Sequence, residues 1–260
     1  MQPTRQSGTP SQSAHRPREL LPHPTTGPRP TPFAYQHSRS LSKANPVGVY
    51  DCTIVTAEGE AHFAPWDSYA AELLLHGFST AQRLRQDVGQ IVGYEYPTFD
   101  YTKLKLFFLS VLWRAGASSQ EFFKRVDLGP HFDTLRNRLL NADPGQPDEY
   151  AVVLAVFDDD PDWAKIMDPF PERYGETGIR FYRLYVGNFI AYVKVDQRPA
   201  ESPIQDLQLT PDAPLRIVQR SFAESKERCV MRNVVVETER RNKVMNHNAG
   251  KAADGVTCAG

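Results

Sequence analysis

Apolar residues recur at helical spacing in the first half of the chain. One helix face is marked at i, i+3, i+4, i+7 and i+8 by Trp66, Tyr69, Ala70, Leu73 and Leu74,. Pro65 suits the first turn of a helix and Gly77 its end. The pattern therefore predicts a helix from Pro65 to Gly77, preceded by a strand in the β-rich stretch Val47–Val55.

The longest apolar block follows at Tyr101–Leu140. Lys103–Ala115 is apolar around most of a helix circumference, which is typical of a buried helix. A Ser-x-x-Glu capping box at Ser118 and Glu121 predicts a second, short helix. A third helix is expected after Gly129-Pro130. Between the first helix and this block, we expect one or two helical turns over 78–88 and an extended segment over 91–101.

From Tyr150 onward the period changes to that of strands. Tyr150–Phe157 is continuously apolar, which predicts a central strand. Ile179–Val186 and Phe189–Val195 flank Gly187-Asn188, which predicts a two-residue hairpin,. Two further short strands are expected at Leu207–Leu209 and Leu215–Arg220, and a charged helix is expected after Ser221.

This order predicts an α+β fold, with an N-terminal helical layer packed on an antiparallel β-sheet, a C-terminal helix and disordered termini. We expect a disordered Pro/Arg-rich leader over 1–45, a single α+β domain over 46–225, and a C-terminal helix with a flexible tail over 226–260. The leader is poor in large apolar residues and rich in proline, so it cannot offset the entropy of ordering,.

The charges of the chain nearly balance, with a formal net charge of −1. No whole-chain field therefore favours an acidic partner. The leader is basic, and two interpretations of it remain open: an arm that contacts nucleic acid, or a solvated tail. The three cysteines are Cys52, Cys229 and Cys258. Their wide spacing favours reduced thiols in a cytoplasmic protein, and no apolar run is long enough to span a membrane.

Motifs that carry chemistry are sparse. The sequence contains no phosphate loop, no dinucleotide fingerprint, no nucleophile elbow and no HExxH pair,. His62 and Asp67 are candidates for a general base with its orienting acid. Asp158, Asp160 and Asp162 are candidates for a divalent cation site, although the calcium-loop spacing is absent. Tyr182, Tyr185 and Tyr192 would form either a base-stacking platform or the packed face of a hairpin. Arg114 is expected to cap its helix or to pair with Asp127.

Two stretches carry a resemblance to a known family. Val49–Ala70 reads VYDCTIVTAEGEAHFAPWDSYA, and Lys103–Ser118 is followed by Leu128-Gly129-Pro130-His131 and Leu135-Arg136. Over about residues 46–225 the chain resembles an uncharacterised bacterial and phage family. Members of that family begin with a CxxC zinc module similar to the start of HNH-type nucleases.

The zinc ligands implied by this resemblance are missing here. The positions of the family's second CxxC hold Thr56 and Gly59, and no CxxC lies upstream. A structural zinc site needs about four ligands, so we expect zinc in intact relatives only and no cofactor in this chain. A shifted reading frame over residues 1–45 would also explain the leader.

Three hypotheses of function follow. The first is a non-catalytic, degenerate member of this family that recognises a macromolecular partner, with nucleic acid a candidate through the leader. The second is a small-ligand-binding or structural α+β domain. The third is a metal-dependent nuclease that uses His62, Asp67 and the acidic run. Whether the chain is an enzyme stays open, and the missing ligands favour a non-enzyme.

Overall fold

The structure is a computed structural model that describes residues 54–87, 89–157, 168–230, 232–233, 236 and 240. The predicted leader, the acidic run with Asp158, Asp160 and Asp162, and the final tail lie outside these residues. The predicted strand Val47–Val55 also lies mostly outside them, and its last two residues, Ile54 and Val55, are not in a strand.

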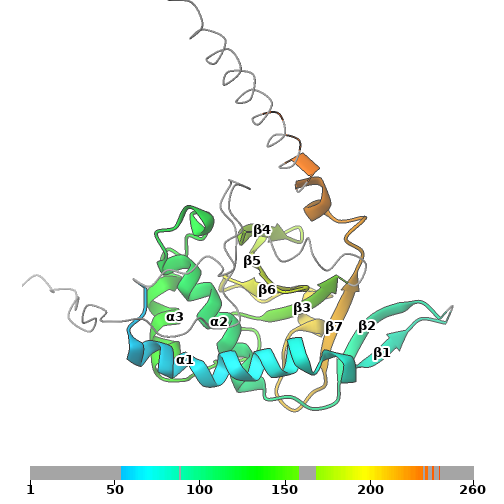
Figure 1. Cartoon of the computed structure of the whole chain (residues 1–260), viewed down its shortest axis with the longest axis horizontal. Coiled ribbons are helices and arrows are strands. Elements are labelled where there is room, and N and C mark those ends of the chain that lie inside the picture. The colour runs from blue at the N-terminus through cyan, green and yellow to red at the C-terminus, as the bar shows by residue number, and fades with distance from the viewer. Residues whose placement is uncertain are drawn as a thin grey trace, which may run out of the picture.

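The described part of the chain folds around a seven-stranded sheet in the order β1-β2-β7-β3-β6-β5-β4 (Figure 1). The strands are β1 Gln82–Arg85, β2 Ile91–Tyr96, β3 Val152–Phe157, β4 Phe170–Tyr174, β5 Ile179–Val186, β6 Phe189–Lys194 and β7 Leu215–Arg220. Five of the neighbouring pairs are antiparallel, whereas β3 and β7 run parallel. The α+β class with a mostly antiparallel sheet is confirmed, and the β3–β7 pair is the one parallel pair among the described strands.

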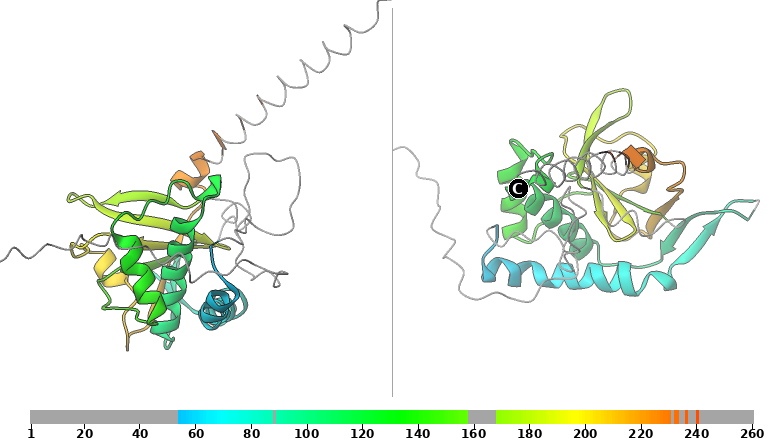
Figure 2. Two further views of the ribbon diagram at one scale, coloured as in Figure 1. Left: turned by 90° about the vertical axis from the view of Figure 1, so that its left-hand side faces the viewer. Right: turned by 45° about the horizontal axis from the view of Figure 1, so that its top comes forward.

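Helices cover one face of this sheet (Figures 1 and 2). They are α1 Ala57–Ala70, which continues as a π-helical segment, η1 Ala71–His76, then α2 Tyr101–Ala117 and α3 His131–Leu140. Single 3-10 turns occur at η2 Phe78–Thr80 and η3 Glu121–Phe123, and the short α5 spans Ile204–Leu207. The predicted helices at Lys103–Ala115 and after Gly129-Pro130 are therefore confirmed.

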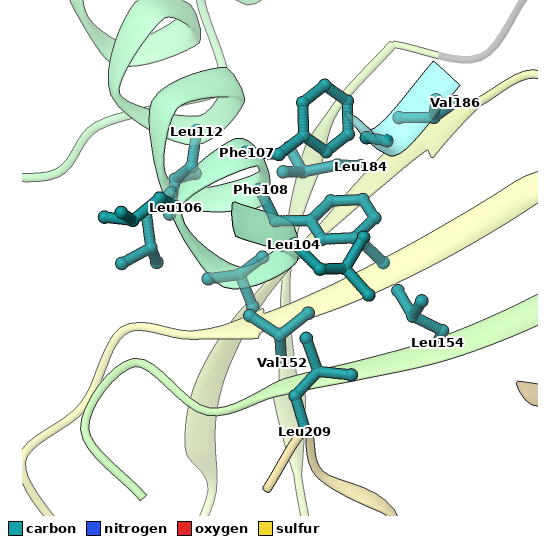
Figure 3. Packing of buried hydrophobic residues seen from close by; sticks show 14 of the residues in the cluster. Leu104, Leu106, Phe107, Phe108, Leu112, Val152, Leu154, Leu184, Val186 and Leu209 are labelled. Atoms are coloured by element: carbon teal, nitrogen blue, oxygen red, sulfur yellow. The ribbon is translucent and has the colours of Figure 1, made fainter. Parts of the chain in front are cut away.

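Helix α2 lies at the centre of the largest apolar core. Leu104, Phe107 and Phe108 have no exposed surface and pack with the inward residues of β3 and β5, such as Leu154 and Leu184 (Figure 3). Full burial of such side chains contributes roughly 1.5–3 kcal/mol each. The cluster extends from Phe63 in α1 to Ile217 in β7, so one core unites the helices with the sheet.

The opposite face of the sheet has two smaller apolar clusters. One gathers Ala155, Phe157, Tyr185, Ile190 and Phe222, and the other gathers Val153, Ile179, Phe181, Ala200 and Ile204. Successive strand residues point to opposite faces, so Tyr182 and Leu184 enter the helical core whereas Arg183 and Tyr185 face away from it. Segments that follow β6 and β7 cover this second face.

Several element boundaries differ from the sequence predictions. Helix α1 begins at Ala57, because the Thr56 hydroxyl accepts a hydrogen bond from the Gly59 amide and caps the helix,. Pro65 therefore lies inside the helix rather than in its first turn. Residues 82–85 form strand β1 instead of extending a helix, and Leu207–Leu209 is not a strand. The helix predicted from Ser118 is only the 3-10 turn Glu121–Phe123, and the Ser118 hydroxyl accepts from the Gln120 amide just before that turn.

The hairpin prediction is confirmed in detail. Strands β5 and β6 pair from Phe181–Lys194 to Val186–Phe189, and Gly187 adopts a φ of +60° in the connection. Glycine enters this left-handed region at little cost. Strand β3 lies fourth of seven in the sheet, as its continuous apolar sequence predicts.

Candidate functional site

Thr56 and Gly59, the positions of the missing zinc ligands, form the first turn of α1. The Thr56 Oγ1 lies 3.2 Å from the Gly59 amide nitrogen. A Cβ placed on Gly59 would come within 2.2 Å of the Val55 Cγ1. The pair therefore serves as a helix cap in a crowded turn. A hydroxyl and a glycine offer no thiolate or imidazole, so these residues do not fit a structural zinc ion.

His62 joins helix α1 to the end of α3. Its Nε2 lies 2.8 Å from the carbonyl oxygen of Leu139, and since a carbonyl only accepts, Nε2 carries the donated proton. The imidazole also packs edge-on against the Trp66 ring, with centroids 5.1 Å apart. The same carbonyl, at the C-terminus of α3, also accepts from the Ala142 amide at 3.1 Å.

Asp67 is buried at the contact between α1 and α2, where it forms an ion pair with Arg114. The guanidinium donates to both carboxylate oxygens, at 2.9 and 3.2 Å, and also to the Ser110 hydroxyl at 3.1 Å. Arg114 therefore pairs with Asp67 and not with Asp127, which corrects that expectation. His62 and Asp67 are five residues apart in a helix, so they point roughly 140° away from each other around its axis.

Glu60 lies near the same ion pair on α1. Burial raises the pKa of its carboxyl, and the nearby Asp67 adds to this, while Arg114 acts in the opposite direction. Within the residues that the structure describes, no group of three His, Cys, Asp or Glu side chains is arranged to hold a metal ion. The predicted acidic ligands Asp158, Asp160 and Asp162 lie outside those residues.

The aromatic residues of the β5–β6 hairpin pack inward. Tyr182 and Tyr185 have no exposed surface, and Tyr182 donates its hydroxyl to the Asp127 carbonyl at 2.5 Å. Alternation places Tyr182 on the helix-covered face and Tyr185 on the other,. Because these rings are buried on different faces, they do not form a stacking platform for bases.

A buried ionic cluster that sequence reasoning missed lies on the second face of the sheet. We call it the arginine cluster; its members are Glu172, Arg183, Tyr185, Tyr192, Arg220 and Glu227. The Arg183 side chain is 6% exposed and Glu227 is fully buried. Burial alone would raise the pKa of Glu227, but Arg183 and Arg220 outweigh it and lower the pKa. Residues 183 and 227 are far apart in sequence, and no local pattern pairs them.

Lys105 is a second buried charge, on helix α2. Its Nζ donates to the Gln146 carbonyl at 2.6 Å and to the Tyr101 hydroxyl at 3.0 Å. Burial, aided by the nearby Arg138, lowers the pKa of this amine to about 7. Because the Tyr101 hydroxyl also donates to the Gly145 carbonyl at 3.2 Å, Lys105 fastens the loop after α3 to the start of α2.

The ribbon of β1 and β2 reaches away from the body in each view that shows it (Figures 1 and 2), and β1 is its exposed strand. The two strands pair from Gln82–Glu95 to Arg85–Ile91, with a register shift after Leu84. At the tip the Gln86 amide donates to the Gln90 carbonyl at 2.9 Å. Strand β1 ends the sheet, and no described strand pairs with its outer edge.

Two arginines point to one side of this ribbon. Arg83 and Arg85 occupy alternate positions of β1, so both lie on the same face,. Both are exposed, and in the described part of the chain neither forms an ion pair with a carboxylate. The Arg85 guanidinium donates to the Gly89 carbonyl at 2.6 Å, which aligns that side chain along the turn. Sequence reasoning missed this feature because QRLR carries too few apolar residues to mark a strand.

None of the helices in the described residues has the length and hydrophobicity needed to cross a bilayer. Comparison of the chain with family models found no match, and searches of curated proteins and of solved structures found no significant similarity.

Proposed function

We propose that this chain is a non-catalytic, cytoplasmic recognition protein that binds nucleic acid through the β1–β2 ribbon. The projecting ribbon with Arg83 and Arg85 carries the proposal. A two-stranded ribbon fits the major groove of a duplex, and arginine is the side chain best suited to phosphate and guanine. A free and exposed Cys229 is compatible with a reducing compartment,.

Arg83 and Arg85, which have no carboxylate partner in the described part of the chain, are what make nucleic acid the preferred partner. The ribbon carries Arg83 and Arg85 against Asp87 and Glu95, and the Glu95 carboxylate already pairs with Arg216 at 3.1 Å.

Strand β4 forms the other edge of the sheet and has one acidic and one basic residue side by side in sequence, Glu172 and Arg173. It also carries Pro171, which has no backbone N–H to donate to an added strand,. The two edges therefore differ in their capacity to add a strand, and β4 provides a matched control with an exposed arginine of its own.

The test compares charge reversals at the two edges in the full chain. The double variant Arg83→Glu/Arg85→Glu should lose about 10-fold or more in affinity for a fluorescent duplex at low salt, because two phosphate contacts become repulsive. Arg173→Glu on β4, where the arginine is also exposed, should bind as the wild type does. Fluorescence anisotropy measures both, and circular dichroism verifies folding. Equal affinity in all three proteins would exclude the ribbon as the binding surface.

The same comparison separates nucleic acid from a protein partner. If the wild type binds neither duplex nor single-stranded DNA or RNA at low salt, the nucleic-acid proposal is rejected. The free edge of β1 would then remain available for addition of a strand from another protein.

A degenerate zinc module is the part of the proposal that rests on the resemblance to the HNH-like family. It is supported by the use of Thr56 and Gly59 as a helix cap. We expect elemental analysis of the purified full chain to find no stoichiometric zinc. One equivalent of zinc that disappears on mutation of Cys52 and His62 would contradict this expectation.

The alternative of a metal-dependent nuclease gains little from the geometry of its candidate residues. Both oxygens of Asp67 are engaged by Arg114, and His62 donates to a helix carbonyl. The alternative predicts magnesium-dependent nicking of plasmid DNA that Asp67→Ala abolishes. We expect no nicking by the wild type.

A further inference from the structure

The arginine cluster has the arrangement of a binding site that the chain itself fills. Three donors converge on a single atom, the Oε1 of Glu227: a guanidinium nitrogen of Arg183, the Tyr185 hydroxyl at 3.1 Å and a guanidinium nitrogen of Arg220 at 3.4 Å. The two arginines come from β5 and β7, and the tyrosine also comes from β5. The sheet therefore supplies all the donors, and the segment after the sheet supplies the acceptor.

The two arginines are held in place by contacts other than Glu227. Glu172 on β4 binds Arg183 through Nε and a second nitrogen, each 2.5 Å from its Oε2. The Arg183 guanidinium also lies over the rings of Phe170 and Tyr192, at 5.3 and 5.2 Å. Arg220 donates to the Tyr192 hydroxyl and lies 5.5 Å from the Phe157 ring. Packing of this kind orients guanidinium groups before any anion arrives.

Glu227 satisfies the site only in part. Its second oxygen, Oε2, is buried and has no hydrogen-bond partner among the described residues. Leaving a buried acceptor unpaired is costly, and more so for a charged group. An oxyanion with more than two oxygens, or one free to rotate, would use the same donors without the constraint of a protein backbone.

The segment that delivers Glu227 is short and follows directly after β7. Helical backbone begins at residue 226, and the Ser225 hydroxyl caps it by accepting from the Arg228 amide at 3.2 Å,. Phe222 holds the segment against Phe157, with ring centroids 5.3 Å apart. The neighbours Glu224, Lys226 and Arg228 are exposed. Local opening of such a segment requires less free energy than unfolding of the sheet.

We propose that Arg183, Arg220 and Tyr185 form a binding site for a phosphate-type oxyanion, and that the carboxylate of Glu227 occupies it as an internal competitor. Without Glu227, the carboxylate of Glu172 alone faces Arg183, Arg220 and the exposed Lys226, whose Nζ lies 3.4 Å from it, so the site holds excess positive charge. A phosphate group with charge-assisted bonds to both guanidiniums would compensate this charge. Phosphate binding would displace the Glu227 carboxylate and detach residues 222–230 from the sheet. The inference is independent of the β1–β2 ribbon.

The first test removes the competitor from the full chain. Glu227→Ala should bind inorganic phosphate about 10-fold or more tightly than the wild type, because phosphate no longer has to displace the carboxylate. Glu224→Ala, an exposed carboxylate in the same segment, should bind as the wild type does. Glu227→Ala/Arg183→Met should lose the added affinity. Isothermal titration at constant ionic strength measures all four proteins.

The second test uses the wild type, so it stands even if Glu227→Ala fails to fold. Phosphate should increase amide hydrogen exchange over residues 222–230 and leave strands β3 and β5 protected, whereas chloride at equal ionic strength should not. Unchanged exchange in phosphate would overturn the proposal. Folded Glu227→Ala that binds phosphate no better than the wild type would also overturn it, and would make Glu227 a purely structural partner of Arg183.

Discussion

Arginine has opposite roles in two regions of the molecule: the α1–α2 contact and the β1–β2 ribbon. Arg114 is largely buried and donates to Asp67 and Ser110, so its charge is neutralised within the fold. Arg83 is exposed on an edge strand and has no carboxylate partner in the described part of the chain. Asp67 and Arg114 hold the helical layer together, whereas Arg83 of the ribbon is exposed and available to contact a partner.

This comparison predicts that mutations in the helical layer change stability and that mutations in the ribbon change binding. The largest stability effect is expected at Phe107, which is fully buried in α2 and packs edge-on against Phe108 at 4.9 Å. Phe107→Ala should lower the free energy of unfolding by about 3–5 kcal/mol, because it leaves a cavity in the core. Urea denaturation of the full chain measures this. Leu140→Ala, at a position 59% exposed, should change stability by less than about 0.5 kcal/mol.

The next largest effect is expected at Asp67. Asp67→Ala would leave the Arg114 guanidinium with the Ser110 oxygens as its hydrogen-bond partners in a largely buried site. Removal of one member of such a pair costs about 2–4 kcal/mol, somewhat less than in a fully buried pair. Urea denaturation should show this decrease while the affinity for DNA, measured on the folded protein, stays unchanged. A folded Asp67→Ala with weakened DNA binding would contradict the division between the two regions.

A smaller, pH-dependent effect is expected at Lys105, whose pKa is lowered from 10.5 to about 7 by burial. Above pH 7 the folded protein holds this amine neutral while the unfolded chain still binds the proton. Stability should therefore rise with pH between about 7 and 9, with a contribution of up to ~1.4 kcal/mol per pH unit from this group. Below pH 7 the amine is charged in both the folded and the unfolded protein, so burying the charge lowers the free energy of unfolding most in this range.

The variant Lys105→Met removes this titration and keeps a long apolar side chain. It should be more stable than the wild type at pH 6 to 7, and the difference should shrink toward pH 9. Urea denaturation across this range provides the measurement. A constant difference at every pH would show that Lys105 is protonated in the folded protein throughout.

The sequence was sufficient for the elements that carry their own signal. Helix α2 is apolar around its circumference, β3 is continuously apolar, and Gly187 supplies the left-handed φ that the β5–β6 turn needs. These signals are local, because the residues of each segment are enough to favour one secondary structure over the others.

Other features depend on contacts that local patterns do not encode. Strand β1 is exposed on an edge, so burial does not impose alternation on QRLR. The start of α1 is set by the Thr56 cap rather than by Pro65. The parallel pairing of β3 with β7 and the ion pair of Arg183 with Glu227 join segments that are distant along the chain. Closeness in sequence suggests His62 and Asp67 as a functional pair, but the helix points them in different directions.

The salt dependence of nucleic-acid binding tests the role of the ribbon most directly. Neutralising variants avoid the repulsion that charge reversal adds, so Arg83→Gln/Arg85→Gln is compared with Arg173→Gln and the wild type. The binding constant decreases as salt rises, so the slope of log K against log salt is negative. If both ribbon arginines bind phosphates, this slope should become shallower by about 0.9 for each arginine neutralised, or roughly 1.8 in the double variant. Arg173→Gln should keep the wild-type slope. An unchanged slope in the double variant would contradict the account, because it would place the phosphate-binding residues elsewhere on the molecule.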